Sequence, residues 1–142
     1  GVMSGYYQVM ALCKALNGKG KIAAIEGVPS TPPAYQRIAG LKKGLKECPG
    51  LELVDTQVGD WQETKAQNIT RTWLARYGDQ LQGVFASNDA MGRGAAAALK
   101  EKGLNGKVLV TGSDGSNIGL EMVKNGDMLE LAGTQMQFLL AT

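Results

Sequence analysis

The chain has 142 residues, of which 44% are hydrophobic and 20% are charged, and its formal net charge is +2. This size favours one folded domain, and the small net charge does not indicate binding to nucleic acid or to an anionic membrane. The sequence contains no histidine, so the commonest general base and metal ligand is missing. No apolar run approaches the roughly 18 residues that a membrane-spanning helix needs.

Helices and strands are predicted to alternate along the chain. Helical spacing of apolar residues predicts helices, short continuous apolar runs predict buried strands, and Gly, Pro and Asn separate them. The predicted helices span 3–16, 34–48, 60–77, 89–103 and 116–126, and the predicted strands span 21–27, 51–57, 81–86, 107–112 and 128–134. This order predicts an α/β fold with a doubly wound five-stranded parallel sheet, as a three-layer α/β/α sandwich in one domain over 1–142.

Several local features follow from residue type. Asp60 is predicted to cap the helix over 60–77, and Asp89 is predicted to cap the helix after the third strand. Trp73 is predicted to lie in the core, and the run LKKGLK at 41–46 is predicted to be a solvated helix face. For Asn88 two roles stay open: a turn residue that bonds its own backbone, or a side chain in a ligand cleft.

Candidate ligand residues follow the predicted strands. In an open parallel sheet, ligands bind outside the carboxyl ends of the strands. The residues expected there include Arg37, Trp61, Asn88, Asp114 and Gln135. Planar polar side chains bind neighbouring hydroxyls in pairs, and an aromatic ring covers the C–H side of a sugar. The set has no nucleophile–base pair, metal cluster or phosphate loop, so it predicts a small, neutral, polyhydroxylated ligand without catalysis, cofactor or metal.

Four segments resemble the periplasmic sugar-binding proteins of the ribose-binding type, which serve ABC importers. They are IEGVPSTPPAYQRIAGLKKGL at 25–45, GVFASNDAMGRGAAAAL at 83–99, KVLVTGSDG at 107–115 and KNGDMLELAGTQ at 124–135. The resemblance implies that the chain is the C-terminal lobe of a two-lobed protein, with the N-terminal lobe absent. It also implies a protein that is no enzyme, that encloses a monosaccharide or polyol between its lobes, and that delivers it to a membrane permease. The implied location is the periplasm, although the chain contains no signal peptide.

The resemblance assigns polar ligand contacts to four residues. Arg37 and Asn88 match residues that bind sugar hydroxyls, and Asp114 matches an aspartate that accepts hydrogen bonds from them. Gln135 matches a glutamine at the tip of the last strand. All four residues are therefore expected to line one side of a sugar site.

Three further residues complete the expected site. Trp61 falls where the family has an aromatic residue that packs on the sugar ring, and Val28 matches an apolar loop residue near the ligand. Ser113 departs from the ribose-binding pattern, which has an aromatic residue there. Loss of that ring enlarges or polarises the pocket, which argues against ribose itself, while pentose, hexose and polyol ligands all stay open.

Three questions stay open at this point. Cys13 and Cys48 are expected near the ends of two neighbouring helices, where either a disulfide or two free thiols fit the fold. An effector-binding domain of a lactose-repressor-type transcription regulator is the alternative function, because it uses the same fold and similar motifs. An isolated lobe also exposes its cleft, so that surface is a candidate for homodimer formation.

Overall fold

A computed structural model describes residues 1–113, 124–126 and 131–132 of the chain. In chain order these form α1 (Val2–Ala15), β1 (Gly20–Glu26), α2 (Pro32–Glu47), β2 (Leu51–Val58), α3 (Glu63–Tyr77), the 3-10 turn η1 (Gly78–Gln80), β3 (Leu81–Ala86), α4 (Asp89–Glu101), β4 (Leu109–Ser113) and β5 (Leu131–Ala132). The predicted alternation is confirmed over this part of the chain. The predicted helix over 116–126 and most of the strand over 128–134 lie outside the described residues.

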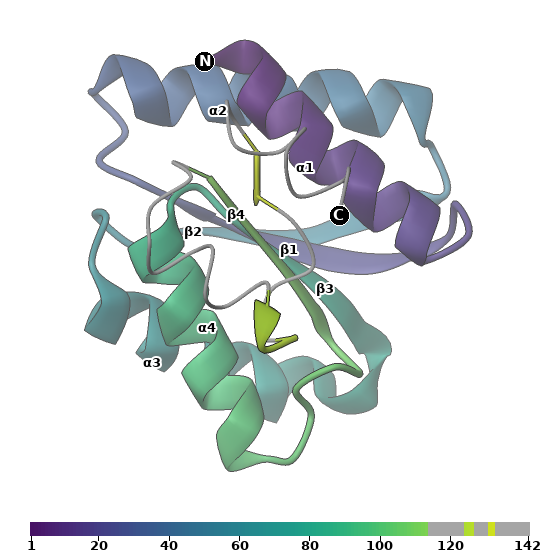
Figure 1. The fold of residues 1–142 in the computed structure, drawn as a ribbon, viewed down its shortest axis with the longest axis vertical. Helices are drawn as coiled ribbons and strands as arrows, with labels where there is room; N and C mark the ends of the chain where they lie inside the picture. Colours follow the sequence, from purple (N-terminus) through teal and green to yellow (C-terminus); the bar gives the residue numbers. More distant parts are fainter. Residues whose placement is uncertain (114–123, 127–130, 133–142) are drawn as a thin grey trace.

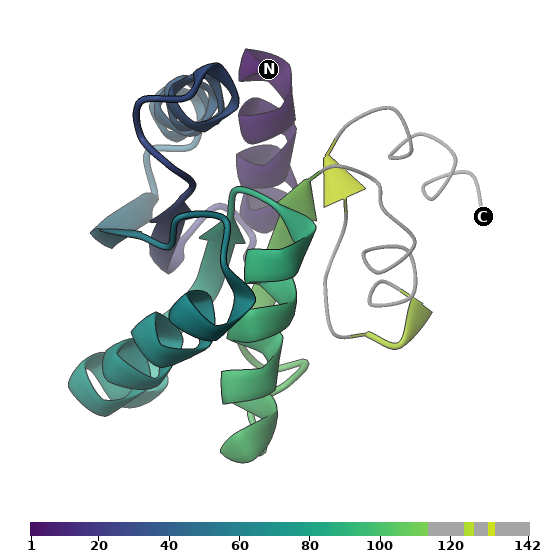
Figure 2. The same cartoon turned by 90° about the vertical axis from the view of Figure 1, so that its left-hand side faces the viewer.

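The sheet is parallel and is covered on both faces. Its strand order is β2-β1-β3-β4, and the two residues of β5 pair in parallel with β4. One layer contains α1 and α2, and the layer on the opposite face contains α3 and α4 (Figures 1 and 2). This is the predicted three-layer sandwich. Four of the five predicted strands are described in full, and the fifth only at Leu131–Ala132.

The strand β1 shows why the strands read as continuous apolar runs. Successive side chains of a strand point to opposite faces of the sheet. Ile22 and Ala24 accordingly join the core under α1 and α2, whereas Ala23 and Ile25 join the core under α3 and α4. Because both faces are buried, no position of the strand interior favours a polar residue.

A disulfide joins Cys13, near the end of α1, to Cys48, directly after α2, and thereby answers a question that the sequence left open. The two Cα atoms are 6.3 Å apart. Two glycines allow the helices to come this close. A Cβ atom on Gly40 would lie 1.9 Å from the carbonyl oxygen of Val2, and a Cβ atom on Gly44 would lie 2.6 Å from Cβ of Val9.

Two smaller predictions are confirmed. Trp73 is 1% exposed in the core, and its Nε1 donates a hydrogen bond of 2.9 Å to Oδ2 of Asp55. Hydrogen bonds from Gln57 and from Trp73 hold the pKa of the Asp55 carboxyl below its ordinary value. The lysines of the run at 41–46 are exposed, as expected for a solvated face.

Both predicted aspartate caps are wrong. Asp60 and Trp61 adopt left-handed backbone, with φ of 54° and 66°, and α3 begins only after the N-cap residue Gln62. At α4 the N-cap is Asn88, whose Oδ1 accepts a hydrogen bond of 2.9 Å from the backbone N–H of Met91. Asp89 is instead the first residue of the helix and is 2% exposed.

None of the described helices combines the length and the apolar character that crossing a membrane requires.

Candidate functional site

Five of the seven predicted ligand residues belong to elements at the carboxyl ends of the strands. The strands are parallel, so these ends meet at one edge of the sheet. The five are Val28 after β1, Arg37 in α2, Trp61 after β2, Asn88 after β3 and Ser113 at the end of β4. Asp114 and Gln135 lie outside the described residues, so their positions stay predictions.

Arg37 is held from two sides at this edge. Its Nη1 donates a hydrogen bond of 2.5 Å to the carbonyl oxygen of Ser87, which directly follows β3. Its guanidinium carbon lies 5.5 Å from the centre of the Trp61 ring, which follows β2. Because β1 lies between β2 and β3 in the sheet, the guanidinium group connects the loops that follow both neighbours of β1. A planar cation is thereby fixed where the sequence expected a sugar-binding group.

Trp61 packs over the end of β1. A Cβ atom on Gly27 would lie 2.2 Å from the indole ring, so the ring occupies space that only a glycine leaves open. The preceding loop is anchored by the N–H of Gly59, which donates to the carbonyl of Glu26 at 2.8 Å. A left-handed backbone is rare for a bulky residue and costs about 1–3 kcal/mol. Such a conformation occurs preferentially at functional sites, and here it places the ring beside Arg37.

Asn88 uses one half of its amide group in the fold. Its Oδ1 caps α4, whereas its Nδ2 donates no hydrogen bond to another described residue. An asparagine carries an acceptor and two donors, so one side chain can cap a helix and still donate to a ligand. The turn role is therefore confirmed, and the ligand role stays a prediction.

Substitution of Asn88 separates these two roles. We expect Asn88→Ala to lower the free energy of unfolding by about 1 kcal/mol, because alanine cannot accept from Met91 N–H. Asn88→Asp should keep the stability, since aspartate is an equally good N-cap, but it replaces the Nδ2 donor by an oxygen. Urea unfolding measures the first effect, and ligand titration of the full-length protein measures the second. Wild-type unfolding of Asn88→Ala would contradict the cap, and wild-type affinity of Asn88→Asp would contradict the ligand role.

Val28 and Ser113 are both engaged in the fold. Ser113 is 1% exposed, and its Oγ lies 2.8 Å from Oγ of Ser4 on α1. The carbonyl of Val28 accepts hydrogen bonds from the N–H and the hydroxyl of Thr31, at 3.0 Å and 2.6 Å. Val28 thus helps to begin α2, the helix that carries Arg37. For both residues, contact with a ligand stays a prediction.

Ser87 belongs to the site although the sequence did not predict it. Its carbonyl accepts from Arg37, and its N–H donates to the carbonyl of Ile25 at 3.1 Å. Its hydroxyl is fully buried and has no hydrogen-bond partner among the described residues. The one sequence signal for Ser87 is its position between a buried strand and Asn88. A backbone acceptor leaves no other trace in the sequence.

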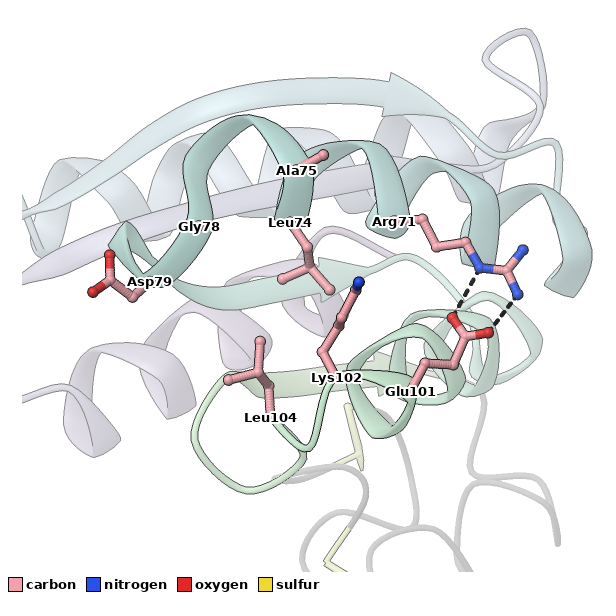
Figure 3. Close-up of a pocket in the computed structure, with 8 residues that line it drawn as sticks. All are labelled: Arg71, Leu74, Ala75, Gly78, Asp79, Glu101, Lys102 and Leu104. Carbon is pink, nitrogen blue, oxygen red and sulfur yellow. Dashed lines mark hydrogen bonds and ion pairs between the residues drawn. The ribbon is translucent and has the colours of Figure 1, made fainter.

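A pocket of about 690 Å³ lies at the opposite end of the sheet (Figure 3). Arg71 and Glu101 form an ion pair of 2.6 Å across it, and Leu74 and Leu104 supply apolar lining. It also includes Gly78 of η1, which leads directly into the amino end of β3. None of the predicted ligand residues lines it. In the described part of the chain, no three Cys, Asp or Glu side chains gather as a metal site.

Comparison with known proteins finds related sequences over nearly the whole chain. Residues 2–139 match the periplasmic binding protein domain family. A xylitol-binding protein of Mycolicibacterium smegmatis is 34% identical over 96% of this chain and 38% of its own length. A ribose import binding protein of Haemophilus influenzae is 33% identical over 90% of this chain and 42% of its own length.

Solved structures show the same relationship. A periplasmic solute-binding protein of an ABC transporter from Actinobacillus succinogenes, with bound D-allose, superimposes with a TM-score of 0.85 at 37% identity, over 89% of this chain and 45% of that chain. A twin-arginine translocation pathway signal protein from Burkholderia phytofirmans superimposes with a TM-score of 0.90 at 41% identity, over 92% of this chain and 40% of that chain. The chain thus spans less than half of each of these relatives.

Proposed function

Because this chain belongs to the periplasmic binding protein domain family, we propose that it is the sugar-binding lobe of the solute-binding component of an ABC sugar importer. Its ligand is a monosaccharide or polyol that binds at the carboxyl ends of β1–β4. The observation that carries this proposal is the placement of Arg37 between Trp61 and Ser87. A planar donor beside an aromatic ring suits vicinal hydroxyls and an apolar ring face. The relatives named for xylitol, ribose and allose support the same ligand chemistry.

The proposed protein has a second lobe that supplies the other ligand contacts. The relatives' greater length supports this, with the chain as the C-terminal lobe. Closure of two lobes on the sugar follows from tighter binding to the closed form, which is the form presented to the permease. We propose a periplasmic location, and the Cys13–Cys48 disulfide supports it because disulfides persist in oxidising compartments.

The importer component is favoured over the transcription regulator. The xylitol-binding and ribose import binding relatives and the structure with bound D-allose are solute-binding proteins. The family consists of substrate-binding proteins, and we propose no catalytic step for this chain. Formation of a homodimer through the exposed cleft of an isolated lobe is a separate prediction. Static light scattering of the isolated lobe tests it by measuring the molar mass in solution.

Thermal-shift titration of the full-length, two-lobed protein tests the proposal. The panel contains D-ribose, D-allose, xylitol, myo-inositol, further pentoses and hexoses, and L-leucine as the control ligand. A ligand that binds only the folded state stabilises it by about 2.7 kcal/mol at 100 times its Kd. We expect one sugar or polyol to raise the Tm by several degrees, and Trp61→Ala to remove that shift. If no sugar or polyol shifts the Tm, the proposed ligand class is wrong.

A further inference from the structure

The helix α1 contacts two elements of the candidate site without contributing a predicted ligand residue. It lies between α2, which carries Arg37, and β4, which ends at Ser113 (Figure 2). Most residues of α1 are apolar, but Ser4 and Gln8 are polar and lie one helical turn apart. Gln8 is 2% exposed, and Ser4 is half-buried. Buried polar side chains in an apolar helix need a structural or functional reason.

Two side-chain hydrogen bonds connect α1 to β4. The Ser4 and Ser113 hydroxyl oxygens are 2.8 Å apart, and Thr111 Oγ1 donates to Gln8 Oε1 at 2.7 Å. Four residues along a helix rise about 6 Å, and two residues along a strand rise about 6.6 Å. The two bonds therefore match in spacing, and they fix the position of α1 along β4. Apolar contacts alone would define the position of α1 along β4 less precisely, because hydrophobic burial has no directional preference.

The same turn of α1 touches the backbone of Arg37. A Cβ atom on Gly5 would lie 2.0 Å from the Arg37 carbonyl oxygen, so the two helices meet at that point without a side chain between them. Ser4 and Gly5 are adjacent in the sequence. One turn of α1 thus contacts both the end of β4 and the residue of α2 that carries the guanidinium group.

We propose that Ser4, Gly5 and Gln8 are positioning residues of the ligand site. These residues set the distance between Arg37 and the end of β4. That distance in turn sets the spacing between the predicted ligand-binding groups of α2 and β4. Binding groups must be held within about 0.5 Å of their productive positions, and residues behind them provide that support. The inference rests on the proposed function, because Arg37 and Ser113 are ligand residues only under it.

Affinity measurements on the full-length protein test the inference. The probe is the member of the sugar and polyol panel that binds wild type best. We expect Ser4→Ala and Gln8→Met each to raise its Kd about 5- to 20-fold, while the ligand-free Tm changes by less than about 3 °C. Gln8→Met leaves the buried Thr111 hydroxyl without its acceptor, but it also removes the Gln8 Nε2 group, which is buried without a hydrogen-bond partner among the described residues, so the net loss of stability should be small. Ser4→Thr keeps the hydroxyl and should bind close to wild type.

Thr70→Val is the matched control for a buried hydroxyl. Thr70 is fully buried, and its Oγ1 donates to the Ala66 carbonyl within α3 at 2.9 Å. This variant should lower the Tm without changing the Kd. The inference is overturned if Ser4→Ala and Gln8→Met both bind like wild type, or if their Kd changes only in proportion to a lowered Tm, as a general loss of structure would produce.

A measurement without ligand separates this inference from the proposed function. In hydrogen–deuterium exchange we expect Ser4→Ala and Gln8→Met to raise amide exchange in 109–113 and 34–40, but not in α3. If wild type binds no member of the panel, the proposed function fails, and exchange alone decides whether α1 holds these two elements. Unchanged exchange in both segments overturns the inference whatever the panel shows.

Discussion

Arg37→Met is expected to weaken sugar binding by the full-length protein by about 100-fold or more. The guanidinium group offers several charged donors to ligand hydroxyls, and each such bond is worth about 1.5–3 kcal/mol. Two lost bonds therefore correspond to at least a hundredfold change, since about 1.4 kcal/mol is a factor of ten. Arg37→Lys should not restore affinity, because an ammonium group lacks the planar fork and stacks poorly beside Trp61. Isothermal titration with the best-bound sugar measures the effect.

Arg76→Met is the matched control for this change. The Arg76 guanidinium also lies over an aromatic ring, 5.2 Å from the centre of Tyr77, but on the exposed last turn of α3. It should bind sugar like wild type. Loss of Arg37 leaves the Ser87 carbonyl without that donor, so a thermal melt of each variant must accompany the titration. Wild-type affinity of a folded Arg37→Met variant would remove Arg37 from the site.

Removal of the Cys13–Cys48 disulfide is expected to lower the free energy of unfolding by about 3–4 kcal/mol. The bond closes a loop between residues 35 positions apart, and the chain-entropy account gives this magnitude for such a loop. The suitable variant is Cys13→Ala with Cys48→Ala, because a serine at the buried position 48 would place a new hydroxyl in the core. Urea unfolding of the full-length protein, followed at the transition of this lobe, measures the loss.

The disulfide experiment has two internal controls. Wild type in reducing buffer should approach the stability of the double variant, and the reductant should leave the double variant unchanged. Sugar affinity should stay near the wild-type value, because the disulfide joins the C-terminal ends of α1 and α2, away from the carboxyl ends of the strands. A loss below about 1 kcal/mol would contradict the stabilising role.

The fold was predictable because its signals are local. Buried parallel strands require continuous apolar runs, and glycine and proline mark the turns between them, so each described strand and helix was found near its position. The prediction was wrong at the starts of α3 and α4. Left-handed backbone at Asp60 and Trp61 delays α3 until after Gln62, whereas at α4 two neighbouring residues compete for the cap position. Asn88 and Asp89 can each cap a helix, and the backbone conformation of the tertiary structure gave the cap to Asn88.

By itself, the sequence determined the α/β alternation, the edge of the sheet at which a ligand would bind, and the residues Arg37, Trp61 and Asn88 as candidates. The tertiary structure decided how those candidates are held: Arg37 against a carbonyl of Ser87, and Trp61 over the bare backbone of Gly27. It also decided the disulfide and the contact of α1 with β4. These features depend on which backbones approach across long stretches of chain, and such distances follow from the packing of whole helices and strands rather than from any local pattern of residues.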